Sequence, residues 1–262
     1  FLYGNAFGRI LLKIFMKSHM DRLVVRYLKS GLSKGMVRSY AKKHDIPLNP
    51  EQLKAFRSFR EFFIRSSDNL VIDTNPRHLI SPCDGYLSAF RINEDSSFSI
   101  KASQYRISEL LQDEELAKTY QGGTCLIFRL CASDYHHYCY IDNGRLGQSH
   151  EIPGVLHSVQ PIVCEKLPVF VLNKRCWTLL ETENFGLVVQ TEIGALIVGG
   201  IVNNNTDIFR RGEEKGRFEL AGSTIVLLFQ KDRMRLSSEI TDALKSCDEV
   251  RVAYGSHIGF SE

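Results

Sequence analysis

After residue 67 the chain is built from short segments rich in β-branched and aromatic residues, separated by Gly, Pro, Asn or Asp. Such segments are typical of strands joined by turns. One short helix is expected among them, at "RISELLQ" (106–112). The predicted strands are "YLSAFRI" (86–92), "TCLIFRLC" (124–131), "HHYCYID" (136–142), "GVLHSVQPI" (154–162), "VFVLNKRCWTLLET" (169–182), "FGLVVQTEI" (185–193), "ALIVGGIV" (195–202) and "STIVLLFQ" (223–230).

Residues 1–67 have a helical pattern instead. In the first sixteen residues, apolar side chains recur at helical spacing beside Arg9 and Lys13. This pattern fits a core-facing helix or a helix lying on a membrane surface. Three further helices are predicted: one begins near Ser18 or His19 and reaches about Lys29, one is N-capped by Ser33 and ends near His44, and one is N-capped by Ser58. The expected fold is α+β, with a helical segment (1–67) followed by a mainly antiparallel β domain (68–262).

Composition excludes several classes of function. The net charge of +3, with no basic block, argues against a nucleic-acid partner. The seven cysteines include no Cys-x-x-Cys pair, so we expect free, mostly buried thiols and no metal site. No segment has the apolar length of a membrane-spanning helix.

Small residues stand directly before the last predicted strand, where "AGS" (221–223) leads into "TIVLLF". Such a run either makes a turn or leaves the backbone open to chemistry. Other segments supply an acid, Asp84 in "SPCDG", and two histidines, His136 and His157. An acid, a histidine and a hydroxyl are the groups that activate a serine. The Gly-x-Ser-x-Gly motif of common serine hydrolases is absent from the sequence.

Seven stretches in order resemble the phosphatidylserine decarboxylase family, and the resemblance covers nearly the whole chain. The stretches are "FGRILLKIFM" (7–16), "SFREFFIR" (58–65), "LISPCDGYLSAF" (79–90), "FRLCASDYHHYCYIDNG" (128–144), "GVLHSVQPI" (154–162), "KGRFELAGSTIVLLF" (215–229) and "YGSHIGF" (254–260).

The resemblance implies self-cleavage between Gly222 and Ser223, with Ser223 becoming a pyruvoyl group. The ketone of that cofactor forms a Schiff base with phosphatidylserine, which loses carbon dioxide to give phosphatidylethanolamine. The product of cleavage is a heterodimer of chains 1–222 and 223–262, and its assembly into a higher oligomer stays open. A lipid substrate implies a peripheral protein on the cytoplasmic side of the cell membrane, where the helix at 1–16 would be interfacial.

One position departs from the family pattern. The family usually has a second histidine three residues after that of Asp-Tyr-His, and this chain has Cys139 there. Asp84 and Ser223 carry over directly, and His136 matches the first histidine. We therefore favour His136 for the site, with His157 second. His137 and Cys139 itself remain alternatives for the base.

Two other functions stay open at this point. One is a pyruvoyl decarboxylase of a soluble amino acid. The other is an unprocessed lipid-binding protein without activity, which the cysteine at 139 would permit.

Overall fold

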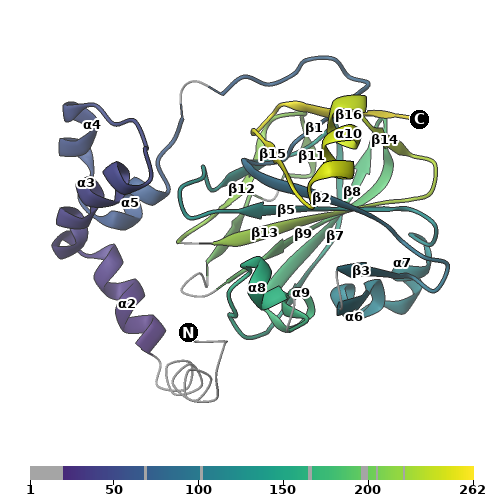
Figure 1. Cartoon of the computed structure of the whole chain (residues 1–262), viewed down its shortest axis with the longest axis horizontal. Coiled ribbons are helices and arrows are strands. Elements are labelled where there is room, and N and C mark those ends of the chain that lie inside the picture. The colour runs from purple at the N-terminus through teal and green to yellow at the C-terminus, as the bar shows by residue number, and fades with distance from the viewer. Residues whose placement is uncertain are drawn as a thin grey trace. The chain divides into compact units, whose positions relative to one another are not determined.

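The computed structural model describes residues 20–67, 70–100, 103–164, 167–195, 200–204, 206–220 and 222–262. The helix predicted within residues 1–16 lies outside these ranges. The chain divides into two compact units, Phe1–Ser66 and Ser67–Glu262. Figure 1 shows the helices and strands of both units.

The first unit is helical in its described part. Its elements are α2 (Met20–Lys29), the 3-10 helix η1 (Gly31–Ser33), α3 (Lys34–Lys43), α4 (Pro50–Ala55) and α5 (Phe59–Phe63). Ser58 caps α5 as predicted, because its side chain accepts a hydrogen bond from the Glu61 N–H. Ser33 precedes α3 but does not cap it. Its hydroxyl instead accepts a hydrogen bond from the Phe59 N–H and so ties α5 to the end of η1.

The second unit is organised around an eight-stranded sheet in which every pairing is antiparallel. This confirms the α+β class with an antiparallel sheet. Across the sheet the order is β11 (Ile208–Phe209), β7 (Gly144–Ile152), β8 (Arg175–Thr182), β9 (Gly186–Ile193), β13 (Ser223–Phe229), β5 (Thr124–Leu130), β2 (Gly85–Arg91) and β15 (Val250–Val252).

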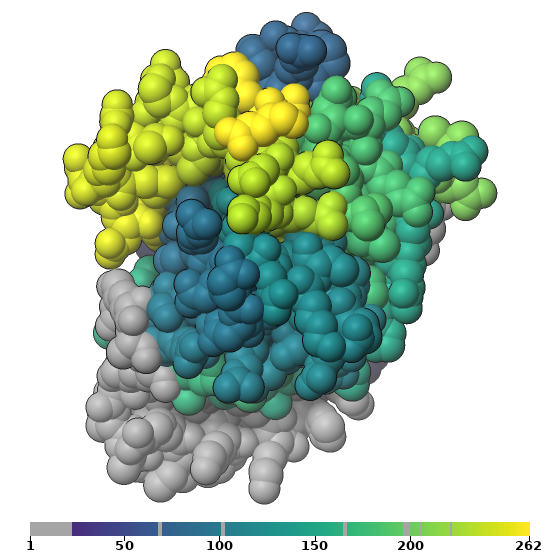
Figure 2. All heavy atoms as spheres, turned by 90° about the vertical axis from the view of Figure 1, so that its right-hand side faces the viewer, coloured from purple at the N-terminus to yellow at the C-terminus, as the bar shows by residue number. Residues whose placement is uncertain are grey.

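Smaller sheets and short helices surround this sheet. One small sheet has the order β1 (His78–Ile80), β16 (His257–Ser261), β14 (Met234–Leu236); a second has β10 (Ile201–Asn203), β12 (Glu214–Phe218), β6 (His137–Cys139); and β3 (Ser97–Ile100) pairs with β4 (Ser103–Arg106). The helices are α6 (Ile107–Leu111), α7 (Glu114–Lys118), α8 (Pro161–Cys164), α9 (Val169–Leu172) and α10 (Ser238–Ser246). The C-terminal segment and the residues around α6 and α7 share one face of this unit (Figure 2).

Strand β13 lies in the middle of the large sheet, between β9 and β5 (Figure 1). All seven of its residues are buried. Both of its edges are hydrogen-bonded, and its apolar side chains are removed from water, as the run "TIVLLF" predicts. The strand therefore fixes Ser223, its first residue, on a rigid element.

Several local predictions were wrong. Residues 154–162 form a loop with one isolated bridge at Val155 followed by α8, and 169–172 is helix α9 rather than strand. The polar stretch 203–218 contains β11 and β12, which are not among the strands predicted from the sequence. Strand β7 was missed because "GRLGQSHEI" has little β-branched character, and its pairing with β8 forms it.

Candidate active site

Ser223 begins β13 at one end of the large sheet. It pairs with Leu130 of β5, and the next residue, Thr224, pairs with Ile193 of β9. Ser223 is fully buried, and its hydroxyl oxygen has no hydrogen-bond partner within the described structure. A buried hydroxyl without a partner is costly and unusual. It is therefore a candidate for a reacting group.

Gly222 precedes this serine with a φ of +29°. A side chain is strained at such an angle, which glycine adopts without a Cβ penalty. Among the described residues, a Cβ built on Gly222 would meet only Val159 Cγ2, at 4.0 Å. The backbone before Ser223 is thus conformationally unusual but not crowded, so the 222–223 peptide bond can be approached.

Asp84 lies at the same end of the sheet, directly before β2. Its Oδ1 accepts a bond from the Tyr254 N–H at 2.8 Å, and its Oδ2 accepts one from the Tyr135 N–H at 3.4 Å. Strand β5 separates β2 from β13, so the strands that carry Asp84 and Ser223 are about 10 Å apart. A group between them is needed for the acid to act on the serine.

His136 is fully buried directly before β6, and its chain segment adjoins Asp84 through Tyr135. Its carbonyl accepts a bond from the Phe218 N–H, and residues 219–222 lead from there to Ser223. His136 Nδ1 is 2.8 Å from the Asp134 carbonyl oxygen, which can only accept. Nδ1 therefore carries a proton, and in the neutral ring Nε2 has the lone pair that a base requires.

His137 and Cys139 have other surroundings. His137 Nδ1 lies 2.9 Å from Glu214 Oε2, and its ring stacks on Tyr135. Cys139 is fully buried, with Sγ 3.8 Å from the Ser81 carbonyl oxygen. Burial raises the pKa of the Cys139 thiol to about 12, because the thiolate is disfavoured away from water. Cys139 stays protonated at neutral pH and is a poor base.

His157 reaches the site through Asn173 and not from a strand as predicted. Asn173 is fully buried; its Oδ1 accepts from the His157 N–H, and its Nδ2 donates to the carbonyls of His157 (2.8 Å) and Gly194 (2.7 Å). Gly194 follows Ile193, so it lies level with Ser223. Burial lowers the pKa of His157, so its ring is neutral at pH 7. Sequence reasoning missed Asn173, whose only signal is a polar residue inside an apolar segment.

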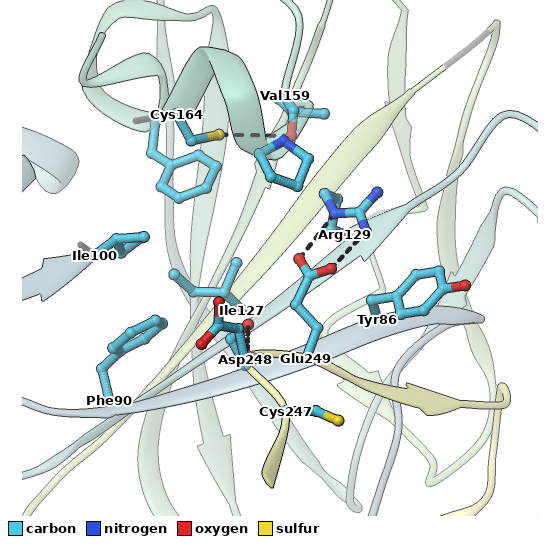
Figure 3. A pocket seen from close by; sticks show the side chains of 13 residues that line it. Tyr86, Phe90, Ile100, Ile127, Arg129, Val159, Cys164, Cys247, Asp248 and Glu249 are labelled. Atoms are coloured by element: carbon cyan, nitrogen blue, oxygen red, sulfur yellow. Dashed lines mark hydrogen bonds and ion pairs between the residues drawn. The ribbon is translucent and has the colours of Figure 1, made fainter. Parts of the chain in front are cut away.

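Ser223 and Thr224 point to opposite faces of the sheet. A pocket of about 370 Å³ opens on the face of Thr224 (Figure 3). Register places Arg129 of β5 and Tyr86 of β2 level with Thr224. Val159, the neighbour of Gly222, also lines it. The pocket thus adjoins the 222–223 peptide bond.

Comparison with known proteins places this chain in a family. The model of the phosphatidylserine decarboxylase family matches residues 56–260. The chain belongs to the phosphatidylserine decarboxylase family. Two similar relatives are phosphatidylserine decarboxylase proenzyme 2 of Clostridium acetobutylicum, 38% identical over 99% of this chain and 90% of the relative, and a phosphatidylserine decarboxylase proenzyme of Clostridium perfringens, 36% identical over 98% and 90%.

The family assignment confirms the resemblance drawn from the seven stretches. The structure also bears on the cysteines, on metal binding and on membrane-spanning helices. The seven thiols are free, and all but Cys131 and Cys247 are buried, as expected. Among the described residues, no group of three or more His, Cys, Asp or Glu could hold a metal ion. None of the helices in the described ranges is both long and apolar enough to cross a membrane.

Proposed function

We propose that this member of the phosphatidylserine decarboxylase family converts phosphatidylserine to phosphatidylethanolamine and carbon dioxide, using a pyruvoyl group made from Ser223. The observation that carries this proposal is the unpartnered, buried hydroxyl of Ser223 beside Gly222 at φ +29°. These residues fit the cofactor, because an N-terminal pyruvoyl group needs a serine that can reach the preceding carbonyl. Residue 223 at the start of β13 would hold the pyruvoyl group, which would supply a ketone able to take up an amine and an electron sink for decarboxylation.

The processing reaction uses this chain's own atoms. Ser223 Oγ attacks the Gly222 carbonyl carbon, the C–N bond breaks, and the freed Ser223 nitrogen takes a proton. The ester that results loses the Ser223 Cα proton and the Cβ–Oγ bond, which releases a chain ending in the Gly222 carboxylate. Water then replaces the nitrogen of the dehydrated residue, and ammonia leaves. Serine is required at 223 because its Cβ–O bond must break.

We assign His136 as the first candidate for the base that takes the Ser223 proton. Two contacts support this assignment: the Nδ1 bond to Asp134, which leaves the Nε2 lone pair, and the Asp84 carboxylate bonded to the neighbouring Tyr135 N–H. His157 is the second candidate, because Asn173 ties it to the strand end beside Ser223. The raised pKa of Cys139 argues against that thiol in this role.

The two chains made by cleavage can stay together without a covalent bond. The small chain would begin with β13, which pairs with β5 and β9, and would continue to β15 on β2 and β16 on β1. Two ion pairs would also join the chains, Arg129 with Glu249 and Arg251 with Asp134. Burying one Val, Leu, Ile or Phe side chain is worth about 1.5–3 kcal/mol, and β13 alone buries several.

Exposed apolar side chains support a peripheral position on a membrane surface, which we propose to be the cytoplasmic one. In the first unit, Leu23 and Tyr27 on α2 are 65% and 42% exposed, beside the basic Arg26 and Lys29. Apolar side chains with adjacent cations bind anionic lipid surfaces. This helical segment is the part of the chain to which we assign membrane association.

The decarboxylation assay tests the proposal. Purified protein is incubated with phosphatidylserine in mixed micelles and, in parallel reactions, with free serine or aromatic amino acids. Carbon dioxide release is measured for each substrate. We expect the wild-type protein to release carbon dioxide from phosphatidylserine and not from the amino acids. The Ser223→Ala protein should release none from any substrate. Release from a soluble amino acid instead would favour the alternative decarboxylase, and an uncut, inactive wild type would favour a lipid-binding protein.

A further inference from the structure

The pocket beside Gly222 has a polar end and an apolar end. Tyr86 and Arg129 line it at the level of Thr224, whereas Phe90 lies four residues further along β2, at the level of Leu228. With a rise of about 3.3 Å per residue, these levels are about 13 Å apart. Ile100 and Phe170 also line the pocket, and Ile100 lies near Phe90 in Figure 3. The apolar end therefore lies away from Ser223.

The charges in the pocket disfavour an anionic headgroup inside it. The Arg129 guanidinium is paired with Glu249 through two bonds, of 2.9 and 2.6 Å, which neutralise it (Figure 3). The remaining charged lining residue is Asp248, which is acidic and exposed at the rim. A phosphate or carboxylate would meet no unpaired cation among these lining side chains. The rest of the wall offers aromatic and aliphatic surface.

We propose that this pocket is the subsite for an acyl chain of the lipid substrate, with the headgroup at Ser223 and the chain extending along β2 and β5 toward Phe90, Ile100 and Phe170. The inference rests on the proposed function, because it takes the reacting headgroup to be at residue 223. Its own basis is the approach of Val159 to Gly222 at the near end and the apolar lining at the far end. At about 370 Å³ the pocket is within the usual size range of small-molecule sites.

Two variants change the far end in opposite directions. Ile100→Trp narrows it and Phe90→Ala widens it. The matched control is Ile208→Trp, on the edge strand β11 at the opposite side of the sheet, where Ile208 is 65% exposed. Self-cleavage on a denaturing gel and the far-UV circular dichroism spectrum show whether each variant is folded.

The readout is kcat/KM for two substrates with the same headgroup, monomeric dihexanoyl phosphatidylserine and glycerophosphoserine, which has no acyl chain. Burying one methylene is worth about fourfold in affinity. A variant that keeps two or more acyl-chain methylenes out of the pocket should therefore lower kcat/KM by about tenfold or more. We expect that loss for dihexanoyl phosphatidylserine in Ile100→Trp, with less than about twofold change for glycerophosphoserine. Phe90→Ala should raise the preference for dioctanoyl over dihexanoyl chains, and Ile208→Trp should match wild type.

An equal loss for both substrates in Ile100→Trp, or no loss for either, would overturn the assignment of this pocket. Failure of the proposed function gives a different pattern, in which wild type decarboxylates neither substrate. Calorimetric titration with dihexanoyl phosphatidylglycerol, which has no amine, then judges the pocket by itself. Binding to wild type that is weakened tenfold by Ile100→Trp supports the subsite, and equal binding to both proteins contradicts it.

Discussion

Replacing Asn173 by alanine should destabilise the second unit and displace the loop that carries His157. The substitution removes three hydrogen bonds made by a fully buried side chain, to the His157 N–H and to the carbonyls of His157 and Gly194. At about 1 kcal/mol net per bond, the free energy of unfolding should fall by about 3 kcal/mol. Backbone groups that remain buried without partners would increase this loss.

Urea unfolding of the uncut Ser223→Ala chain measures this loss, because a single chain unfolds without dissociating. Trp177, the one tryptophan of the sequence, is buried in β8, so its emission reports on the large sheet alone. The control is Asn93→Ala, since Asn93 is exposed and its side chain makes a single long bond of 3.5 Å, to Ser97. That variant should change stability by less than about 0.5 kcal/mol.

Asn173→Asp separates the roles of the two side-chain atoms. A carboxylate keeps the acceptor for the His157 N–H but faces two carbonyls without a proton to donate. Its folded-state pKa should be raised, so the variant is most stable below about pH 4, the ordinary aspartate pKa, and loses stability as pH rises through the raised value. If the alanine variant lost less than about 1 kcal/mol, or the aspartate variant were pH-independent, the Asn173 contacts would not hold this loop.

Three further predictions concern the base and the membrane. His136→Ala should abolish self-cleavage or decarboxylation, whereas Cys139→Ala should still cleave at least in part, and the reverse pattern on a denaturing gel would move the base to the thiol. If His157 acts as the base, the midpoint of the rise in processing rate with pH should lie below pH 6.5, because burial lowers the His157 pKa and the ring loses its proton at lower pH; a midpoint above pH 7 would exclude it. Deleting residues 1–16 should weaken sedimentation with anionic vesicles more than it lowers pyruvoyl content, and unchanged sedimentation would refute an interfacial role.

Sequence patterns predicted the elements whose signals are local. The cap at Ser58 and the buried strand after Ser223 depend on neighbouring residues, and both are where the sequence indicated. The loop at 154–162 was misjudged because its apolar residues suggest a strand, whereas its one bridge, at Val155, is isolated and α8 follows. Strand β7 depends on its pairing with β8, which no local pattern reveals.

The candidate site shows the same division. Ser223, Asp84 and His136 could be named from motifs, but their spatial relation depends on register and on single long-range contacts. The Tyr135 N–H that reaches Asp84 joins residues 51 positions apart, and Asn173 reaches the His157 carbonyl from 16 positions away. Hydrogen bonds of this kind follow from tertiary packing. Sequence patterns therefore named candidate residues but could not arrange them.

The intact mass of the purified protein tests the central claim most directly. Self-processing should give two species, one ending at Gly222 and one beginning at residue 223 with a pyruvoyl group in place of serine. The small chain should resist Edman degradation because it has no terminal amine, and borohydride should add two hydrogens to it and end activity. A single mass for the full chain, or a small chain beginning with an unmodified serine, would contradict the account.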